Sequence, residues 1–319
     1  MPVLPSVTID TFRFGTGQSN TIDGTSGNDL IHAGAGADTV RGLPGDDILF
    51  GDRGADQLAG NQGDDVFVWT SGDGADTING GAGIDTLVAV GGDGVNDRFS
   101  VSGNATTTTF QQLSAPTTSL SISNVERLDV QGLGGDDRLS VGSLSGSQVT
   151  ELHFRGGDGA DRLDGGTASI RLVGEGDAGN DRLIGGSRSD QLDGGSGDDF
   201  LSGNGGSDLL FGGAGTDTLT GGNGRDLLEG GTGNDDLTGG AGRDAFVLEA
   251  GGGSDTVRDF VAGNDLLLMR GFTSGGGNPL TFADLNITEQ NGDSVITLGN
   301  DTVTVENATG LAQSDFVFA

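Results

Sequence analysis

Residues 176–247 read GDAGNDRLI, GGSRSDQLD, GGSGDDFLS, GNGGSDLLF, GGAGTDTLT, GGNGRDLLE, GGTGNDDLT and GGAGRDAFV, which is an unbroken run of nine-residue units. The units share the pattern G-G-x-G-x-D-x-U-x, in which U is a large apolar residue. The Asp positions of this run are Asp181, Asp190, Asp199, Asp208, Asp217, Asp226, Asp235 and Asp244. So strict a period is the signature of an architecture in which each repeat stacks on its neighbours.

The same pattern occurs earlier in the chain, where a degenerate unit carries Asn20 in the Asp position. The Asp positions of this earlier block are Asp29, Asp38, Asp47, Asp56 and Asp65. Both blocks end alike, because Asp64–Ile78 and Arg243–Val257 each lengthen the Asp step from nine residues to eleven, giving Asp76 and Asp255. The shared ending predicts two copies of one module.

The nonapeptide predicts a coiled, all-β fold. Its x-U-x residues form a short strand with U facing inward, and its glycines tolerate the positive φ values of a sharp turn. Two units then complete one coil of eighteen residues. Successive coils stack as parallel strands about 4.8 Å apart. We therefore predict a right-handed parallel β-roll or β-helix solenoid in two repeat blocks, with a C-terminal β cap.

The less regular segments complete the predicted domain organisation. Between the blocks we expect wider coils with a projecting Thr-rich loop at Thr106–Thr118, and apolar alternation in Val295–Val305 predicts antiparallel strands near the end. The predicted regions are an N-terminal strand and cap (1–23), a first β-roll (24–90), irregular wider coils (91–154), a second β-roll (155–258), and a C-terminal cap and secretion-signal region (259–319).

Composition narrows the possible partners. The 47 acidic residues against 15 basic ones give a formal charge of −32, which disfavours nucleic acid and anionic lipid and favours metal cations. Every basic residue other than the two histidines is Arg, and Cys is absent, so lysine chemistry, disulfides and thiolate sites are excluded. Met1–Asp10 does not resemble a cleavable signal peptide. No apolar run is long enough for a transmembrane segment.

The acidic turns predict calcium binding. Stacked coils place the Asp residues of alternate repeats above one another, which creates a column of like charges beside a thin aliphatic core. Calcium accepts six to eight oxygens from carboxylates and backbone carbonyls in flexible geometry, whereas magnesium requires a stricter octahedron. We therefore predict that several Ca²⁺ ions hold the coils together, and that the chain is disordered without them.

The tandem nonapeptides resemble those of the RTX (repeats-in-toxin, haemolysin-type) calcium-binding family of type I secretion substrates. The resemblance implies that turn carbonyls of one repeat and the Asp of another enclose each ion between adjacent coils. Carried over to this sequence, the implied ligands are Asp29, Asp38, Asp47, Asp56, Asp65, Asp76, Asp85, Asp161, Asp181, Asp190, Asp199, Asp208, Asp217, Asp226, Asp235 and Asp244, with the carbonyls of Gly212, Gly221 and Gly230.

No catalytic motif stands out, so we predict that the protein is not an enzyme. The zinc motif H-E-x-x-H and the nucleophile elbow G-x-S-x-G are both absent. His32 occupies an outward position, where we expect a solvated side chain, and His153 lies in a strand-like stretch, where we expect a structural role. Trp69 is expected to cover the end of the first roll, although a sugar-binding role is the alternative.

The predicted function is that of a secreted structural protein, located outside the cell or at its surface. It would pass through type I secretion machinery, fold on Ca²⁺, and assemble as a homo-oligomer or polymer into a surface layer, filament or matrix. Thr8–Phe14 and Val295–Glu306 are the expected contact strands. The alternative is a calcium-dependent binding module for a host or a cell-surface polysaccharide, resembling rhizobial nodulation exoproteins or the repeat modules of alginate epimerases.

Overall fold

The computed structural model describes residues 4–5, 7–115, 117–273 and 280–318 and divides the chain into two compact units. The first contains residues 1–158 and 163–173, and the second contains residues 159–162 and 174–319. Both units are parallel β-solenoids, and the described residues contain no α-helix, only two 3-10 turns, η1 (Phe282–Asp284) and η2 (Gln313–Asp315). The predicted fold class is confirmed. No described helix is long and apolar enough to cross a membrane.

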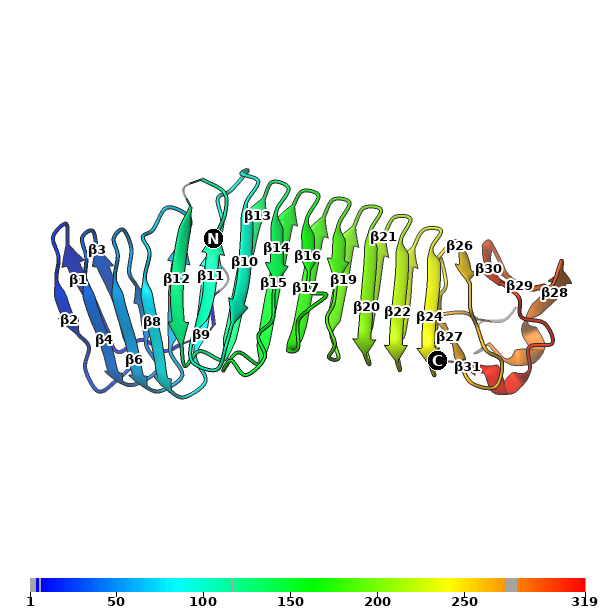
Figure 1. The fold of residues 1–319 in the computed structure, drawn as a ribbon. Coiled ribbons are helices and arrows are strands. Elements are labelled where there is room, and N and C mark those ends of the chain that lie inside the picture. Colours follow the sequence, from blue (N-terminus) through cyan, green and yellow to red (C-terminus); the bar gives the residue numbers. More distant parts are fainter. Residues whose placement is uncertain (1–3, 6, 116, 274–279, 319) are drawn as a thin grey trace. The chain divides into compact units, whose positions relative to one another are not determined.

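The first unit builds two strand stacks, A and B, which form opposite walls of its coils (Figure 1). Stack A contains β1 (Thr11–Thr16), β3 (Asp29–Gly34), β5 (Ile48–Phe50), β7 (Val66–Thr70), β9 (Thr86–Val90), β13 (Arg127–Gly134) and β15 (Glu151–Asp158). Stack B contains β2 (Thr21–Asp23), β4 (Thr39–Pro44), β6 (Gln57–Gln62), β8 (Thr77–Ala82), β10 (Arg98–Gly103), β11 (Thr108–Gln112), β12 (Thr118–Ser123) and β14 (Arg138–Val141).

The second unit repeats this plan. Stack A contains β19 (Gln191–Ser196), β21 (Leu209–Ala214), β23 (Leu227–Thr232), β25 (Ala245–Glu249), β27 (Leu266–Arg270) and β31 (Phe316–Phe318). Stack B contains β18 (Arg182–Ile184), β20 (Phe200–Gly206), β22 (Thr218–Gly224), β24 (Asp236–Gly242), β26 (Ser254–Val257), β28 (Asn286–Gln290), β29 (Asp293–Leu298) and β30 (Asp301–Val305). The boundary between the units passes through β16 (Arg162–Asp164) and β17 (Arg171–Ala178).

The strands pair in parallel with a register of one coil, as the period predicts. Leu210 of β21 lies opposite Leu228 of β23, eighteen residues later, and both are fully buried. Leu209, next to Leu210, faces outward and is 40% exposed. The strands are longer than the predicted three residues, because β21 continues through the glycines that open the next repeat. Gly213 of β21 has φ +106°, which an L-residue rarely adopts.

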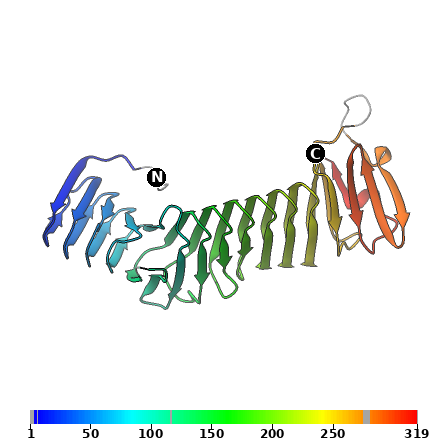
Figure 2. The same cartoon turned by 90° about the horizontal axis from the view of Figure 1, so that it is seen from above.

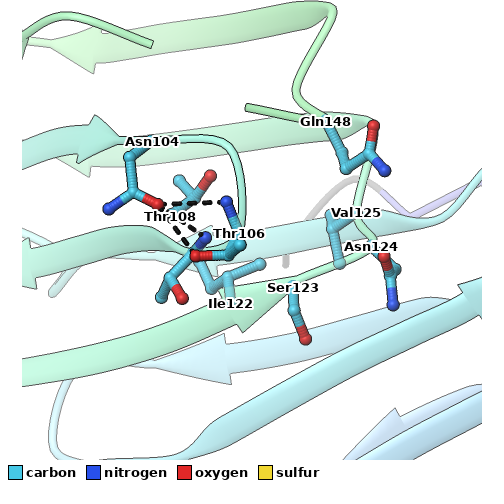
Figure 3. Close-up of a pocket in the computed structure, with 9 residues that line it drawn as sticks. Asn104, Thr106, Thr108, Ile122, Ser123, Asn124, Val125 and Gln148 are labelled. Atoms are coloured by element: carbon cyan, nitrogen blue, oxygen red, sulfur yellow. Dashed lines mark hydrogen bonds between the residues drawn. The ribbon is translucent and has the colours of Figure 1, made fainter. Parts of the chain in front are cut away.

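The Thr-rich segment between the blocks does not project as a loop, contrary to the prediction. Thr108–Gln112 forms β11, the middle strand of an antiparallel meander with β10 and β12. Thr108, Phe110 and Gln112 are all buried on one face, as expected for alternate residues of a strand. The hydrophobicity pattern did not reveal this strand, because two of its three buried residues are polar. The turn before β11 is held by Asn104, whose Oδ1 accepts the Thr106 N–H at 3.0 Å (Figure 3).

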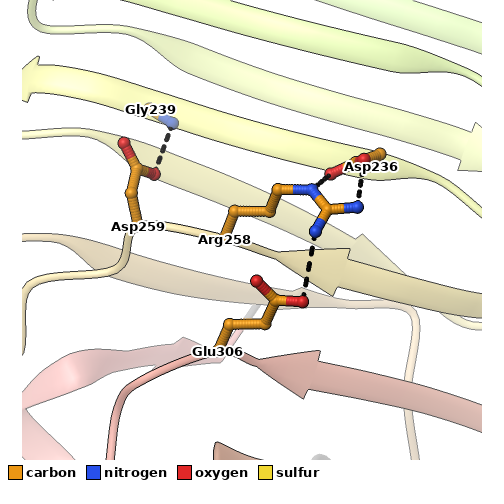
Figure 4. Close-up of polar contacts among 5 residues, drawn as sticks. All are labelled: Asp236, Gly239, Arg258, Asp259 and Glu306. Atoms are coloured by element: carbon orange, nitrogen blue, oxygen red, sulfur yellow. Dashed lines mark hydrogen bonds and ion pairs between the residues drawn. The ribbon is translucent and has the colours of Figure 1, made fainter.

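The predicted antiparallel strands of the C-terminal cap are confirmed as β28, β29 and β30. β30 also pairs in parallel with β26 and is therefore internal, so Val295–Glu306 is not a free contact strand. Arg258 joins the roll to the cap by bonding both Asp236 and Glu306 (Figure 4). Asp259 accepts the N–H groups of Gly239 at 2.8 Å and Gly240 at 2.7 Å, which ends the last regular turn.

The N-terminal segment covers a side of the first unit and does not cap its end. Leu4, Val7 and Ile9 pack on a buried cluster on the outer face of stack A, which comprises Ile48, Val66, Val68, Val88 and Val90. Figure 2 shows the segment turning back from β1 across this stack. The expected contact strand Thr8–Phe14 is therefore reduced to β1, which begins at Thr11 and forms the first strand of stack A.

Inward and outward leucines of one strand provide a test of the roll. Leu210→Ala should destabilise the folded protein by about 2–5 kcal/mol, because it leaves a cavity in the core. The neighbouring change Leu209→Ala is the matched control and should cost much less, since Leu209 is 40% exposed. Denaturant unfolding in calcium measures both, and equal losses would contradict the assigned orientation of β21.

Candidate metal sites in the turns

The repeat aspartates form hydrogen-bonded columns. In the second unit the backbone N–H of Asp199 donates to Oδ1 of Asp217 at 2.8 Å, and that of Asp217 donates to Oδ1 of Asp235 at 2.9 Å. Asp181 belongs to the same column, and Asp190, Asp208, Asp226 and Asp244 form a second one. Each carboxylate therefore gains one backbone donor from the preceding coil, so the expected column of like charges is partly compensated by the protein itself.

The first unit repeats the arrangement. Asp29, Asp47, Asp65 and Asp85 are linked in one column, and Asp38, Asp56 and Asp76 in another, with N–H to Oδ1 distances between 2.7 and 2.9 Å. Asp161 begins the corresponding ladder in the second unit by donating to Oδ1 of Asp181 at 2.7 Å. All the predicted Asp ligands are 3% exposed or less.

Burial makes these carboxylates costly in their charged form. Burial is the largest effect on Asp65 and raises its pKa to about 8. The hydrogen bond from the backbone N–H of Asp47 lowers this pKa, whereas the neighbouring carboxylates Asp47 and Asp85 raise it. Burial likewise raises the pKa of Asp217 to about 7. The folded turns consequently favour either a proton or a cation beside these groups.

The second oxygen of most of these carboxylates lies in a small space above a glycine, called the cradle below. A methyl group on Gly194 would lie 2.3 Å from Oδ2 of Asp199 and 2.7 Å from the carbonyl oxygen of Gly212, so only glycine fits. The same construction brings Asp208 and Gly221 together above Gly203, and Asp217 and Gly230 together above Gly212. The three predicted carbonyls thus each converge with a predicted carboxylate.

Many of these Oδ2 atoms are buried without a hydrogen-bond donor. They belong to Asp38, Asp47, Asp56, Asp65, Asp85, Asp181, Asp199, Asp208, Asp217, Asp226, Asp235 and Asp244. A buried oxygen without a donor is costly, which makes it a ready ligand for a cation. Among the described residues no three acidic or imidazole side chains gather at one point, so backbone carbonyls must supply much of the coordination. That donor set suits Ca²⁺.

Sequence reasoning missed further members of the columns. Asp97 donates its N–H to Oδ1 of Asp137 at 2.6 Å, and Asp244 donates to Oδ1 of Asp265 at 3.0 Å. Asp137 also shares a glycine cradle with the Gly156 carbonyl. A signal existed for both, because GLGGDDRLS contains Asp137 and AGNDLLL contains Asp265 in the Asp position of the repeat.

The residues considered for other chemistry have structural surroundings. His32 is not freely solvated as expected, because its ring stacks between Phe14 and Phe50 and Nδ1 lies 3.2 Å from Asp52. Trp69 is 1% exposed and packs edge-on against Phe110, so it cannot offer a surface to a sugar. The Nδ1 atom of His153 lies 2.9 Å from the Arg155 guanidinium, in keeping with a structural role.

Comparison with known proteins identifies the same repeats. A family model for the RTX calcium-binding nonapeptide repeat (four copies) matches residues 14–49, 32–67, 70–87, 153–168, 175–210 and 211–246, about half of the chain. No curated protein matches the sequence.

Two solved structures show low similarity. The extracellular lipase LipA of Serratia marcescens is 20% identical with a TM-score of 0.29, over 94% of this chain and 40% of that chain. The AlgE6R3 subunit of the Azotobacter vinelandii mannuronan C5-epimerase is 24% identical with a TM-score of 0.23, over 42% of this chain and 80% of that chain. The chain therefore spans less than half of the lipase, and neither likeness bears on activity.

Two aspartates nineteen residues apart test the cradles. Asp217→Asn keeps the acceptor for the Asp199 N–H but weakens the ligand, so it should raise the calcium concentration at which the chain folds by several-fold. Asp198→Asn removes the same charge from an exposed position, where Asn180 and Asn234 already stand in other coils, and should leave that concentration nearly unchanged. Circular-dichroism titration with calcium compares the two, and equal shifts would contradict the cradles.

Acidity should substitute in part for calcium. The folded pKa of Asp65 is about 8 and that of Asp217 about 7, above the unfolded value of 3.8. The folded chain therefore binds more protons, and stability in EGTA should fall as the pH rises from 4 to 8. Circular dichroism of the metal-depleted protein from pH 4 to pH 8 measures this dependence as the folded fraction. A folded fraction without calcium that stays constant or rises with pH over this range would contradict the assignment.

Proposed function

Because this chain belongs to the RTX calcium-binding nonapeptide repeat family, we propose that it is a secreted, non-catalytic structural protein that folds on Ca²⁺ outside the cell. RTX nonapeptides bind Ca²⁺, and the many repeats of this chain imply several ions. The observation that carries the proposal is the cradle above Gly194, in which a buried Asp199 Oδ2 without a donor meets the Gly212 carbonyl. The same pairing recurs along both units.

Coupling between folding and calcium follows from the charge of the chain. The formal charge of −32 repels the coils from one another, while each coil buries only a narrow apolar ladder. Extracellular calcium modules bind at about 10⁻⁴ to 10⁻³ M, well above the concentration of a resting cytosol. Calcium that binds the folded chain preferentially stabilises it by mass action. We infer that the chain is extended inside the cell and folds after export.

The C-terminal segment supports this order of events. Asp315–Phe318 lies in the predicted secretion-signal region, of which Ala319 is outside the described residues. In the folded protein Phe316 pairs with Leu267, and Oδ1 of Asp315 accepts the Gly263 N–H at 2.8 Å. Secretion machinery that reads these residues would therefore need the unfolded chain.

A structural role through self-assembly would use the outer strands of stack A. These are β1 in the first unit and β31 in the second. β1 exposes Phe12 (62%) and Phe14 (71%), but Arg13 occupies its inward position, opposite Ile31 of the next coil. An inward charge at a sheet edge opposes uncontrolled pairing. We propose that assembly, where it occurs, is limited by Arg13 at this end.

The second candidate function is calcium-dependent polysaccharide binding, and one observation favours it. The exposed ring of Phe14 stacks on His32 at 5.9 Å between ring centres, and His32 stacks on Phe50 at 4.0 Å. Phe14 is the last ring of this stack and is 71% exposed, and Asp52 lies beside His32. An exposed aromatic ring with a neighbouring polar group suits the apolar face of a sugar ring.

Calcium removal and return distinguishes these proposals. Chelation should abolish the β-sheet signal in circular dichroism, and added calcium should restore it. Electron microscopy and light scattering of the refolded protein then detect polymers, and Arg13→Leu should increase their amount. A fully folded chain in excess EGTA would refute calcium-dependent folding. Dispersed monomers in calcium, for wild type and Arg13→Leu alike, would refute assembly, and calcium-dependent pull-down on polysaccharide would then support the second candidate.

A further inference from the structure

The outer face of stack A in the second unit carries an apolar groove that no described residue covers. It crosses the four strands β21, β23, β25 and β27 and has a volume of about 340 Å³. Its lining residues are Leu209, Phe211, Leu227, Glu229, Val247, Leu268 and Arg270. These side chains face away from the core, so the interior packing of the roll does not explain their apolar character.

The duplicated module places an equivalent face in the first unit, across β3, β5, β7 and β9. Alignment of Asp64–Ile78 with Arg243–Val257 equates Val68 with Val247. The strand that follows equates Val88 with Leu268. In the first unit this face is covered, because Leu4, Val7 and Ile9 lie on it, and Val68 and Val88 are 3% and 0% exposed.

The N-terminal segment that covers this face in the first unit shows what kind of ligand such a face binds. Residues 4–9 are a stretch of chain with apolar side chains two or three residues apart, LPSVTI. Four strands about 4.8 Å apart span about 14 Å between the outer two, and six extended residues reach about 20 Å. A segment of this length therefore crosses a four-strand face, and the groove of the second unit crosses the same number of strands.

The groove of the second unit differs from the equivalent face of the first unit in carrying charged residues at its edge, which suits a bound peptide. Arg270 stands where the first unit has Val90, and it bonds both Glu229 and Glu249. Glu229 and Arg270 both line the groove. An extended peptide has backbone N–H and C=O groups that need partners, and this charged pair can supply both an acceptor and a donor.

We propose that the groove of the second unit is a docking site for an extended peptide segment that carries apolar residues two or three positions apart. The peptide lies across β21 to β27 as Leu4, Val7 and Ile9 lie on the equivalent face of the first unit. A second copy of the chain would have to withdraw its own Leu4, Val7 and Ile9 from its first unit, where they pack on Val68 and Val88. We therefore take the occupant to be a segment of a different protein.

A labelled synthetic peptide tests the site. The probe is LPSVTID, residues 4–10, titrated by fluorescence anisotropy into the full chain in calcium. We expect saturable binding to one site, and at least about tenfold weaker binding by Leu209→Ser/Leu227→Ser, which removes apolar contacts. Val261→Ser removes an apolar side chain that is 54% exposed and outside the groove, and should bind like wild type.

Controls keep the result interpretable. The same peptide with Ser in place of Leu4, Val7 and Ile9 should not bind. If the double variant loses its β-sheet signal, the single change Leu209→Gln replaces it, because Gln191 already occupies that outward column in β19. Absence of saturable binding, or binding unaffected by the groove variants, would overturn the proposal. So would self-association that these variants abolish, or retention of fatty acid instead of peptide.

Discussion

The structure depends on the buried carboxylate of the repeat Asp, whose two oxygens make different contacts. In each coil, Oδ1 of the repeat Asp accepts the backbone N–H of the Asp one coil earlier, and Oδ2 turns toward a glycine and a neighbouring carbonyl. The first contact sets the stacking register, since it requires the two turns to lie directly above one another. In many of the repeat aspartates the second oxygen has no hydrogen-bond donor among the described residues. A fold that buries so many of these oxygens is incomplete without added positive charge.

This dependence explains why the module combines a thin core with a large negative charge. One inward apolar residue per repeat, such as Leu210 or Leu219, provides a continuous but narrow ladder. The ladder specifies which way each strand faces, because a shift by one residue would exchange Leu210 with Leu209. The buried carboxylates make the stability of the same structure depend on the calcium and proton concentrations around it. Stability therefore becomes a property of the medium as well as of the chain.

The two copies of the module show how the outside of a solenoid can diverge while its inside is retained. Phe67 and Phe246 occupy the same inward position and are both fully buried. Outward positions are free to change, because the turns and the core do not constrain them. In the first unit they hold the N-terminal segment and a row of stacked rings, and in the second they form an open groove.

The sequence by itself determined the parallel solenoid, its eighteen-residue coil, the inward ladder and the Asp columns, because each follows from a period that local chemistry enforces. It also indicated most of the candidate ligands. Only the tertiary structure decided the non-periodic parts. Thr108–Gln112 forms a strand because β10 and β12 flank it, and β30 is internal because it pairs with β26. Leu4, Val7 and Ile9 pack on the outer face of stack A. These outcomes depend on contacts between residues far apart in the chain, which no local pattern specifies.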